Sequence, residues 1–202
     1  MEITKNEFEI LNLYKKNIFL EATILEIMKR LSKKSYQRIY EAVKNLEKKK
    51  ILQIDKIGKS NRVRLNFSHE SIVYLSFLEE KEALNKKIPN LNEILNIKEL
   101  KEDIVLITGS YAKNKQTKES DIDLVIIANE KEIGKQKLLD NLTALLKPEF
   151  HNIVINKRDF LEMLKSKEEN FGKEIYKNHL IIKNANSYYA LIKEAVENGF
   201  RS

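Results

Sequence analysis

The sequence predicts an α+β protein with a helical N-terminal domain that ends in a β-hairpin and a C-terminal α/β domain with a short mixed sheet. Its 202 residues suffice for one large domain or two small ones. Only five Gly and two Pro interrupt the chain, which favours helices with short connections. Two apolar runs, 103–108 and 122–127, have the length of buried strands.

The elements of the N-terminal domain follow from apolar periodicity. Helical spacing marks three helices, at 4–17, at 23–31 with Thr23 as N-cap, and from Ser35, the N-cap of the third, to about Lys49. The third helix is expected to direct Ile39, Val43 and Leu46 inward. The segment 51–67 then alternates as two strands around a turn. A fourth helix is expected over 70–86.

Asn85 to Asn92, which includes Pro89, is the expected joint between domains of residues 1–86 and 87–202. Beyond it we expect the two strands above, a helix at 131–147, a strand at 150–156 and a mainly helical end.

Positive charge is concentrated in the N-terminal domain. The formal net charge is +7, and residues 22–68 hold 13 Lys or Arg against four Asp or Glu. Such a concentration suggests nucleic acid as a partner, although a solvated Lys-rich surface gives the same count.

Composition excludes several classes of protein. The chain has no Cys, which rules out disulfides and thiol catalysis, and its three His lack HxxxH spacing. Carboxylates are therefore the expected metal ligands, and they favour Mg²⁺ or Mn²⁺. No apolar run approaches the roughly 20 residues of a membrane span, and no signal-peptide pattern is present, so a cytoplasmic protein without a membrane partner is expected.

The stretch 23–66 resembles the winged helix-turn-helix domains of small prokaryotic transcription regulators, most closely in KNLEKKKIL, where the third helix meets the hairpin. The resemblance implies double-stranded DNA as partner, with the third helix in the major groove and the hairpin, or wing, on the backbone or minor groove. The residues expected on DNA are Gln37, Arg38, Glu41, Lys44, Asn45, Lys59, Arg62 and Arg64. The alternative is a dimerisation or protein-docking module.

The C-terminal domain places carboxylates and a glycine where they can hold a metal-bound nucleoside triphosphate. Gly109 and Ser110 end the first apolar run, and Asp121 and Asp123 open the second. Alternate side chains of a strand share a face, so the two carboxylates lie together, and a divalent cation relieves their repulsion. Gly109 permits close approach of backbone to a phosphate, and the Ser110 hydroxyl can bind a phosphate oxygen.

Residues 107–127, ITGSYAKNKQTKESDIDLVII, resemble the GS-x10-DxD motif of the polymerase-beta-like nucleotidyltransferases, most closely their minimal prokaryotic members. The resemblance implies catalytic and metal-binding roles for Asp121 and Asp123, and a nucleotide site that includes Gly109, Ser110 and Ser120. The chain has Asn114 where the family usually has Gly, and Asn tolerates left-handed backbone better than most residues.

The superfamily usually has a third carboxylate on a later, antiparallel strand, which here corresponds to 150–156. That segment contains no Asp, and the candidates are Glu149 and His151, which share one face. Spacing to the following KRDF places Glu149 at the catalytic acid position.

The last fifty residues resemble the C-terminal part of archaeal stand-alone nucleotidyltransferases in KEENFGKEIYKNHLII and NSYYALIKEAVENGF. Tyr176, Tyr188 and Tyr189 have the chemistry to stack on adenine, but their helical spacing beside Leu191 favours the core. His179 is expected to be structural or on the surface.

Three functions are compatible with these residues. The first is a Mg²⁺-dependent (or Mn²⁺-dependent) nucleotidyltransferase that transfers AMP from ATP to a protein or small-molecule hydroxyl, fused to a DNA-binding winged helix and capable of homodimerisation. The second is a DNA-binding transcription regulator whose degenerate transferase domain binds nucleotide without turnover. Nucleotide addition to RNA ends is disfavoured, because the chain lacks the extra domains that such enzymes use.

Overall fold

The structure is a computed structural model that describes residues 3–58 and 60–201. These residues form two compact units, one up to Leu78 and the other Glu79–Arg201. The division falls within helix α4 (His69–Leu84), ahead of the joint expected at 85–92. Because α4 contains no Gly or Pro, nothing in its composition marks the division.

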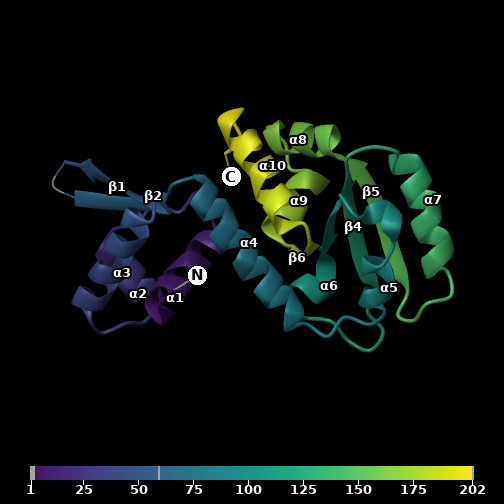
Figure 1. Ribbon diagram of the computed structural model, residues 1–202, viewed down its shortest axis with the longest axis horizontal. Coiled ribbons are helices and arrows are strands. Elements are labelled where there is room, and N and C mark those ends of the chain that lie inside the picture. Colours follow the sequence, from purple (N-terminus) through teal and green to yellow (C-terminus); the bar gives the residue numbers. More distant parts are fainter. Residues whose placement is uncertain (1–2, 59, 202) are drawn as a thin grey trace. The chain divides into compact units, whose positions relative to one another are not determined.

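The N-terminal unit begins with three capped helices, α1 (Lys5–Lys16), α2 (Ile24–Arg30) and α3 (Tyr36–Lys48) (Figure 1). Thr4 and Thr23 each form a capping box with the Glu three residues later, and Ser35 caps α3. The apolar stripe expected on the third helix is buried, and consists of Ile39, Val43 and Leu46.

An antiparallel hairpin follows α3, with strands β1 (Leu52–Ile57) and β2 (Ser60–Leu65). Ala22, just before α2, adds a bridge to Val63 at the centre of β2. The Tyr14 hydroxyl of α1 donates to the Val63 carbonyl at 3.0 Å. The hairpin is therefore held against the helices by backbone and side-chain hydrogen bonds.

The C-terminal unit is built on a four-stranded sheet of order β5-β4-β3-β6. Its strands are β3 (Ile104–Ile107), β4 (Ile122–Ala128), β5 (Phe150–Asn156) and β6 (Leu180–Lys183). Strand β3 is antiparallel to β4 and β6, whereas β5 is parallel to β4. The antiparallel orientation expected for 150–156 was therefore wrong, because helix α7 carries the chain back along the sheet before β5 begins.

Helices complete the C-terminal unit on both faces of its sheet (Figure 1). They are α5 (Leu91–Leu95), a 3₁₀ turn (Lys98–Leu100), α6 (Gly109–Ala112), α7 (Glu132–Thr143), α8 (Lys157–Lys165), α9 (Phe171–Lys177) and α10 (Ala185–Glu197). All residues of β4 except Asp123 are buried, as expected for a central strand covered on both faces.

Among the described residues, no helix is long and apolar enough to cross a membrane.

Candidate functional site

Asp121 and Asp123 lie at the start of the central strand β4. Ile122 between them is fully buried, so the pleat directs both carboxylates to the opposite face. The Asp123 carbonyl accepts a hydrogen bond from the Thr108 amide at 2.9 Å, which ties the acidic pair to the end of β3. The side chains are 41% exposed for Asp121 and 36% for Asp123, so both remain accessible to a ligand.

Gly109 is required by two features of this site. Its φ of +63° lies in the left-handed region, and a Cβ placed on it would be 1.9 Å from Oδ2 of Asp123. The sequence predicted a glycine that brings backbone close to a ligand. The structure adds that the glycine also makes room for the carboxylate itself, so both ends of the GS-x10-DxD motif meet here.

The spacer between Gly109 and Asp121 folds as a short helix and a loop. Asn114 has a φ of +54°, so the expectation that Asn sustains a left-handed turn here is confirmed. The Lys115 amide donates to the Ser110 carbonyl at 2.9 Å. The Ser120 hydroxyl accepts from the Thr117 amide at 2.9 Å, which shapes the loop just before Asp121.

His151, on the neighbouring strand β5, lies beside the two aspartates. Asp123 is paired in register with His151, whose side chain is 60% exposed. Nε2 of His151 lies 3.5 Å from Oδ2 of Asp121, and Nδ1 lies 3.6 Å from Oδ1 of Asp123. Sequence reasoning ranked His151 behind Glu149, because spacing along the chain does not reveal the register of β4 and β5.

Glu149 immediately precedes β5, and its carbonyl accepts from the Ile122 amide at 2.8 Å. Its carboxylate accepts from the Lys147 ammonium at 2.6 Å. Lys147 holds the pKa of Glu149 below its usual value, chiefly through this hydrogen bond and then through its charge. Glu149 is thus an ionised carboxylate whose backbone lies next to the start of β4.

The donor set suits a divalent cation. Two carboxylates provide hard oxygen ligands. Because Gly109 has no Cβ, there is room for the Asp123 carboxylate beside the backbone of residue 109. Within residues 3–58 and 60–201, no three carboxylate or imidazole side chains already enclose a metal position. The residues present therefore fit a metal whose ligand shell is completed by a bound nucleotide and water, as is usual for Mg²⁺.

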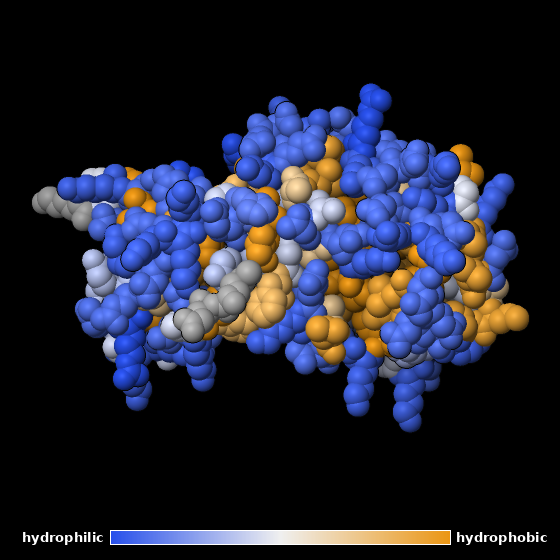
Figure 2. Space-filling view, in the orientation of Figure 1, coloured by the Kyte–Doolittle hydropathy of each residue, from blue (hydrophilic) through white to orange (hydrophobic). Residues whose placement is uncertain are grey.

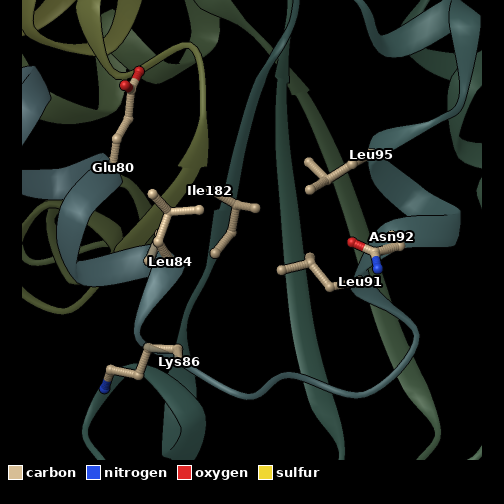
Figure 3. Close-up of a pocket in the computed structure, with 8 residues that line it drawn as sticks. Glu80, Leu84, Lys86, Leu91, Asn92, Leu95 and Ile182 are labelled. Carbon is tan, nitrogen blue, oxygen red and sulfur yellow. The ribbon is translucent and has the colours of Figure 1, made fainter.

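A separate hollow of about 360 Å³ lies in the C-terminal unit, between the end of α4, α5 and the edge strand β6. Leu84, Leu91, Leu95 and Ile182 give it a mainly apolar lining (Figure 3). The acidic pair does not line this hollow. Its chemistry does not suit a triphosphate, so the carboxylates are the better candidate site.

Of the three tyrosines considered for adenine stacking, Tyr188 and Tyr189 belong to the core, whereas Tyr176 is half-buried. Tyr188 and Tyr189 are 1% and 2% exposed, and burial raises the pKa of both hydroxyls well above the usual value. The Tyr189 hydroxyl donates to Oε1 of Glu79 at 3.0 Å, and Nε2 of His179 lies 3.8 Å from the same atom. The structural role expected for His179 is confirmed.

Those side chains expected on DNA that the structure describes lie on the surface of the N-terminal unit, where Figure 2 shows mainly hydrophilic residues. Five of them are exposed on α3: Gln37, Arg38, Glu41, Lys44 and Asn45. The two wing residues, Arg62 and Arg64, are half-buried. Lys59 lies outside the described residues.

Some of the basic side chains on this surface already have acidic partners. Arg62 pairs with Glu26 at 3.1 Å, and Arg64 pairs with Asp55. Lys44 pairs with Glu47 on α3 itself. These acids are already included in the count for residues 22–68, so the net charge is unchanged, but the three basic side chains would have to leave their partners to contact a polyanion.

Comparison with known proteins supports the C-terminal site. A family model described as Polymerase beta, Nucleotidyltransferase matches residues 80–187, which is more than half of the chain and includes the glycine and both aspartates. Comparison with curated proteins and with solved structures found no significant match. The chain therefore belongs to the polymerase beta nucleotidyltransferase family.

Proposed function

We propose that this protein is a metal-dependent nucleotidyltransferase that transfers AMP from ATP to a hydroxyl group of a protein or small molecule. The observation that carries the proposal is the contact between Gly109 and Asp123. A left-handed glycine whose Cβ position is filled by a carboxylate contributes nothing to the apolar core. It leaves an accessible acid next to a backbone segment that a phosphate can approach.

Each residue of the site has a role in this reaction. Asp121 and Asp123 would hold Mg²⁺ or Mn²⁺, which supplies charge neutralisation for the phosphates and the leaving pyrophosphate. The Gly109 backbone and the Ser110 hydroxyl would bind the β- and γ-phosphates, with Ser120 completing the loop. Glu149, ionised beside Lys147, would accept the proton of the attacking hydroxyl.

For the N-terminal unit we propose a winged helix that binds double-stranded DNA. Three helices followed by a hairpin occur in the order of that fold, and the polar face of α3 is exposed. Contacts from α3 would read bases, and Arg62 and Arg64 would contact the backbone after leaving their acidic partners.

A second candidate function is a regulator that binds nucleotide without turnover. Two observations favour it: the residue in register with Asp123 on β5 is His151 rather than an acid, and the Glu149 carboxylate is already bound by Lys147. In that case the site would bind a metal-nucleotide but lack a group to deprotonate the acceptor.

Labelled ATP distinguishes these functions. Incubation with ATP labelled at the α-phosphate, in the presence of Mg²⁺ or Mn²⁺ and a cell extract as the source of acceptor, should label the protein or an acceptor. ATP labelled at the γ-phosphate should not, because pyrophosphate leaves. Asp121→Asn should abolish labelling, while Glu119→Gln, a nearby exposed acid, should not. Metal-dependent ATP binding without transfer would favour the regulator.

A further inference from the structure

Leu84, at the end of α4, lines the apolar hollow of the C-terminal unit and is itself 87% exposed. The other large apolar side chains of the hollow, Leu91, Leu95 and Ile182, are half-buried and form its walls (Figure 3). Apolar surface that stays in contact with water costs about 25 cal/mol per Å² relative to buried surface. Leu84 and the hollow beside it therefore form one apolar surface whose burial would be favourable.

Two opposite charges lie at the two ends of this hollow. Figure 3 shows Glu80 at one end and Lys86 at the other, with Leu84 between them. Glu80 is exposed, and the Lys86 ammonium donates to Oδ1 of Asn114 and keeps two further N–H donors. An apolar centre with polar groups at its rim is the usual composition of a protein–protein interface.

The arrangement of these groups is complementary to itself. In a two-fold symmetric dimer the same patch of both copies meets, so two residues that face each other do so twice, once on each side of the axis. An axis that runs past Leu84, across the line from Glu80 to Lys86, brings Glu80 opposite the partner's Lys86 and Lys86 opposite the partner's Glu80. The Leu84 side chains of both copies then meet at the centre and cover the two hollows. Both charges are thus balanced without a residue from another kind of protein.

We propose that the apolar hollow and its two charged ends form the interface of a symmetric dimer between two copies of this chain. Burial of Leu84 and of the apolar walls would supply most of the affinity, because ion pairs at a solvated rim each contribute little. The charges would instead fix the register, since a shifted dimer leaves them unpaired or places like charges together. The proposal does not depend on the metal site or on nucleotide transfer.

Sedimentation equilibrium of the full chain tests the proposal. The wild type should have twice the mass of one chain at high concentration and should dissociate on dilution. Leu84→Asp should raise the dissociation constant of the dimer more than about 30-fold, because it places a charge at the centre of the apolar contact. Leu145→Asp is the matched control. Leu145 is 94% exposed in the same unit but does not line the hollow, so this variant should dimerise like the wild type. Circular dichroism should show that both variants are folded.

Charge reversal separates a second copy from any other partner. Glu80→Lys and Lys86→Glu should each weaken the dimer about tenfold, since like charges would then face each other twice. The double variant Glu80→Lys, Lys86→Glu should recover the wild-type affinity, because the exchanged charges again pair across the axis. A double variant as weak as the single ones would overturn the proposal, as would a dimer that Leu84→Asp leaves intact. A wild type that remains monomeric at about 1 mM would also overturn it, and would assign the hollow to a different partner.

Discussion

In the C-terminal unit, Gly109 and Asp123 are so close that one additional carbon atom does not fit between them. In the N-terminal unit, the α3 side chains expected on DNA are exposed, and the two wing arginines are held by single acids. The first arrangement depends on the path of the backbone. The second depends on the sum of several surface charges.

This difference predicts how each unit responds to substitution. A sterically defined site should lose its function when one atom is added or one charge is removed. A surface defined by charge should respond gradually, because each exposed pair contributes little and salt screens all of them. The following predictions test that contrast, in order of decreasing expected effect.

Gly109→Ala should have the largest effect on the site. The added Cβ would force the Asp123 carboxylate to rotate away, since Oδ2 would lie 1.9 Å from it. We expect AMP transfer to fall below detection, whereas the free energy of unfolding falls by only about 1–2 kcal/mol for the left-handed backbone. Transfer assays and urea unfolding measure the two effects.

Gly58→Ala is the matched control for this variant. Gly58 has a similar φ of +60°, but a Cβ there would have no atom within 4 Å. Its cost in stability should be that of the left-handed backbone alone, about 1–2 kcal/mol and no more than that of Gly109→Ala, with transfer unchanged. If the two variants were equally active, the close contact at Gly109 would not be part of the site.

Asp121→Asn and Asp123→Asn should each reduce transfer by about three orders of magnitude, because each removes an anionic metal ligand. The melting temperature should stay unchanged or rise, since one of two repelling carboxylates is gone. Thermal unfolding and transfer assays on each variant check this. Severe unfolding in either variant would identify the acids as structural.

Glu149→Gln should lower turnover about 100-fold while the affinity for ATP changes little, because a general base acts in the chemical step. Lys147→Met is the companion variant: without the ammonium, the pKa of Glu149 should rise toward its ordinary value. The carboxylate would then lose its ionised form at a higher pH than in the wild type. Unchanged turnover in Glu149→Gln would exclude it as the base.

The double variant Arg62→Ala, Arg64→Ala should produce the most gradual change. The slope of log affinity for duplex DNA against log salt should flatten by about two units, with all sequences weakened alike. Glu26→Gln should do the opposite and tighten binding modestly, because it frees Arg62. Fluorescence anisotropy in a salt series measures both. Absence of any salt-dependent DNA affinity in the wild type would favour a docking or dimerisation module.

The sequence predicted those parts of the molecule that depend on local periodicity. Thr23 and Ser35 cap helices where expected, and Ile39, Val43 and Leu46 are buried together. The alternation at Asp121 and Asp123 correctly placed both carboxylates on one face of a strand. These features depend on residues a few positions apart, so the chain itself encodes them.

The sequence alone determined an acidic pair after a glycine turn in one unit and a charged helix and hairpin in the other. Only the tertiary structure decided that β5 runs parallel to β4, which places His151 beside the acidic pair. It also decided that the Asp123 carboxylate fills the space where Gly109 lacks a Cβ. The tertiary structure likewise pairs the wing arginines, Arg62 and Arg64, with the acids Glu26 and Asp55. The physical reason is that strand pairing and side-chain contacts join residues far apart in the chain. Local spacing does not specify which of them meet.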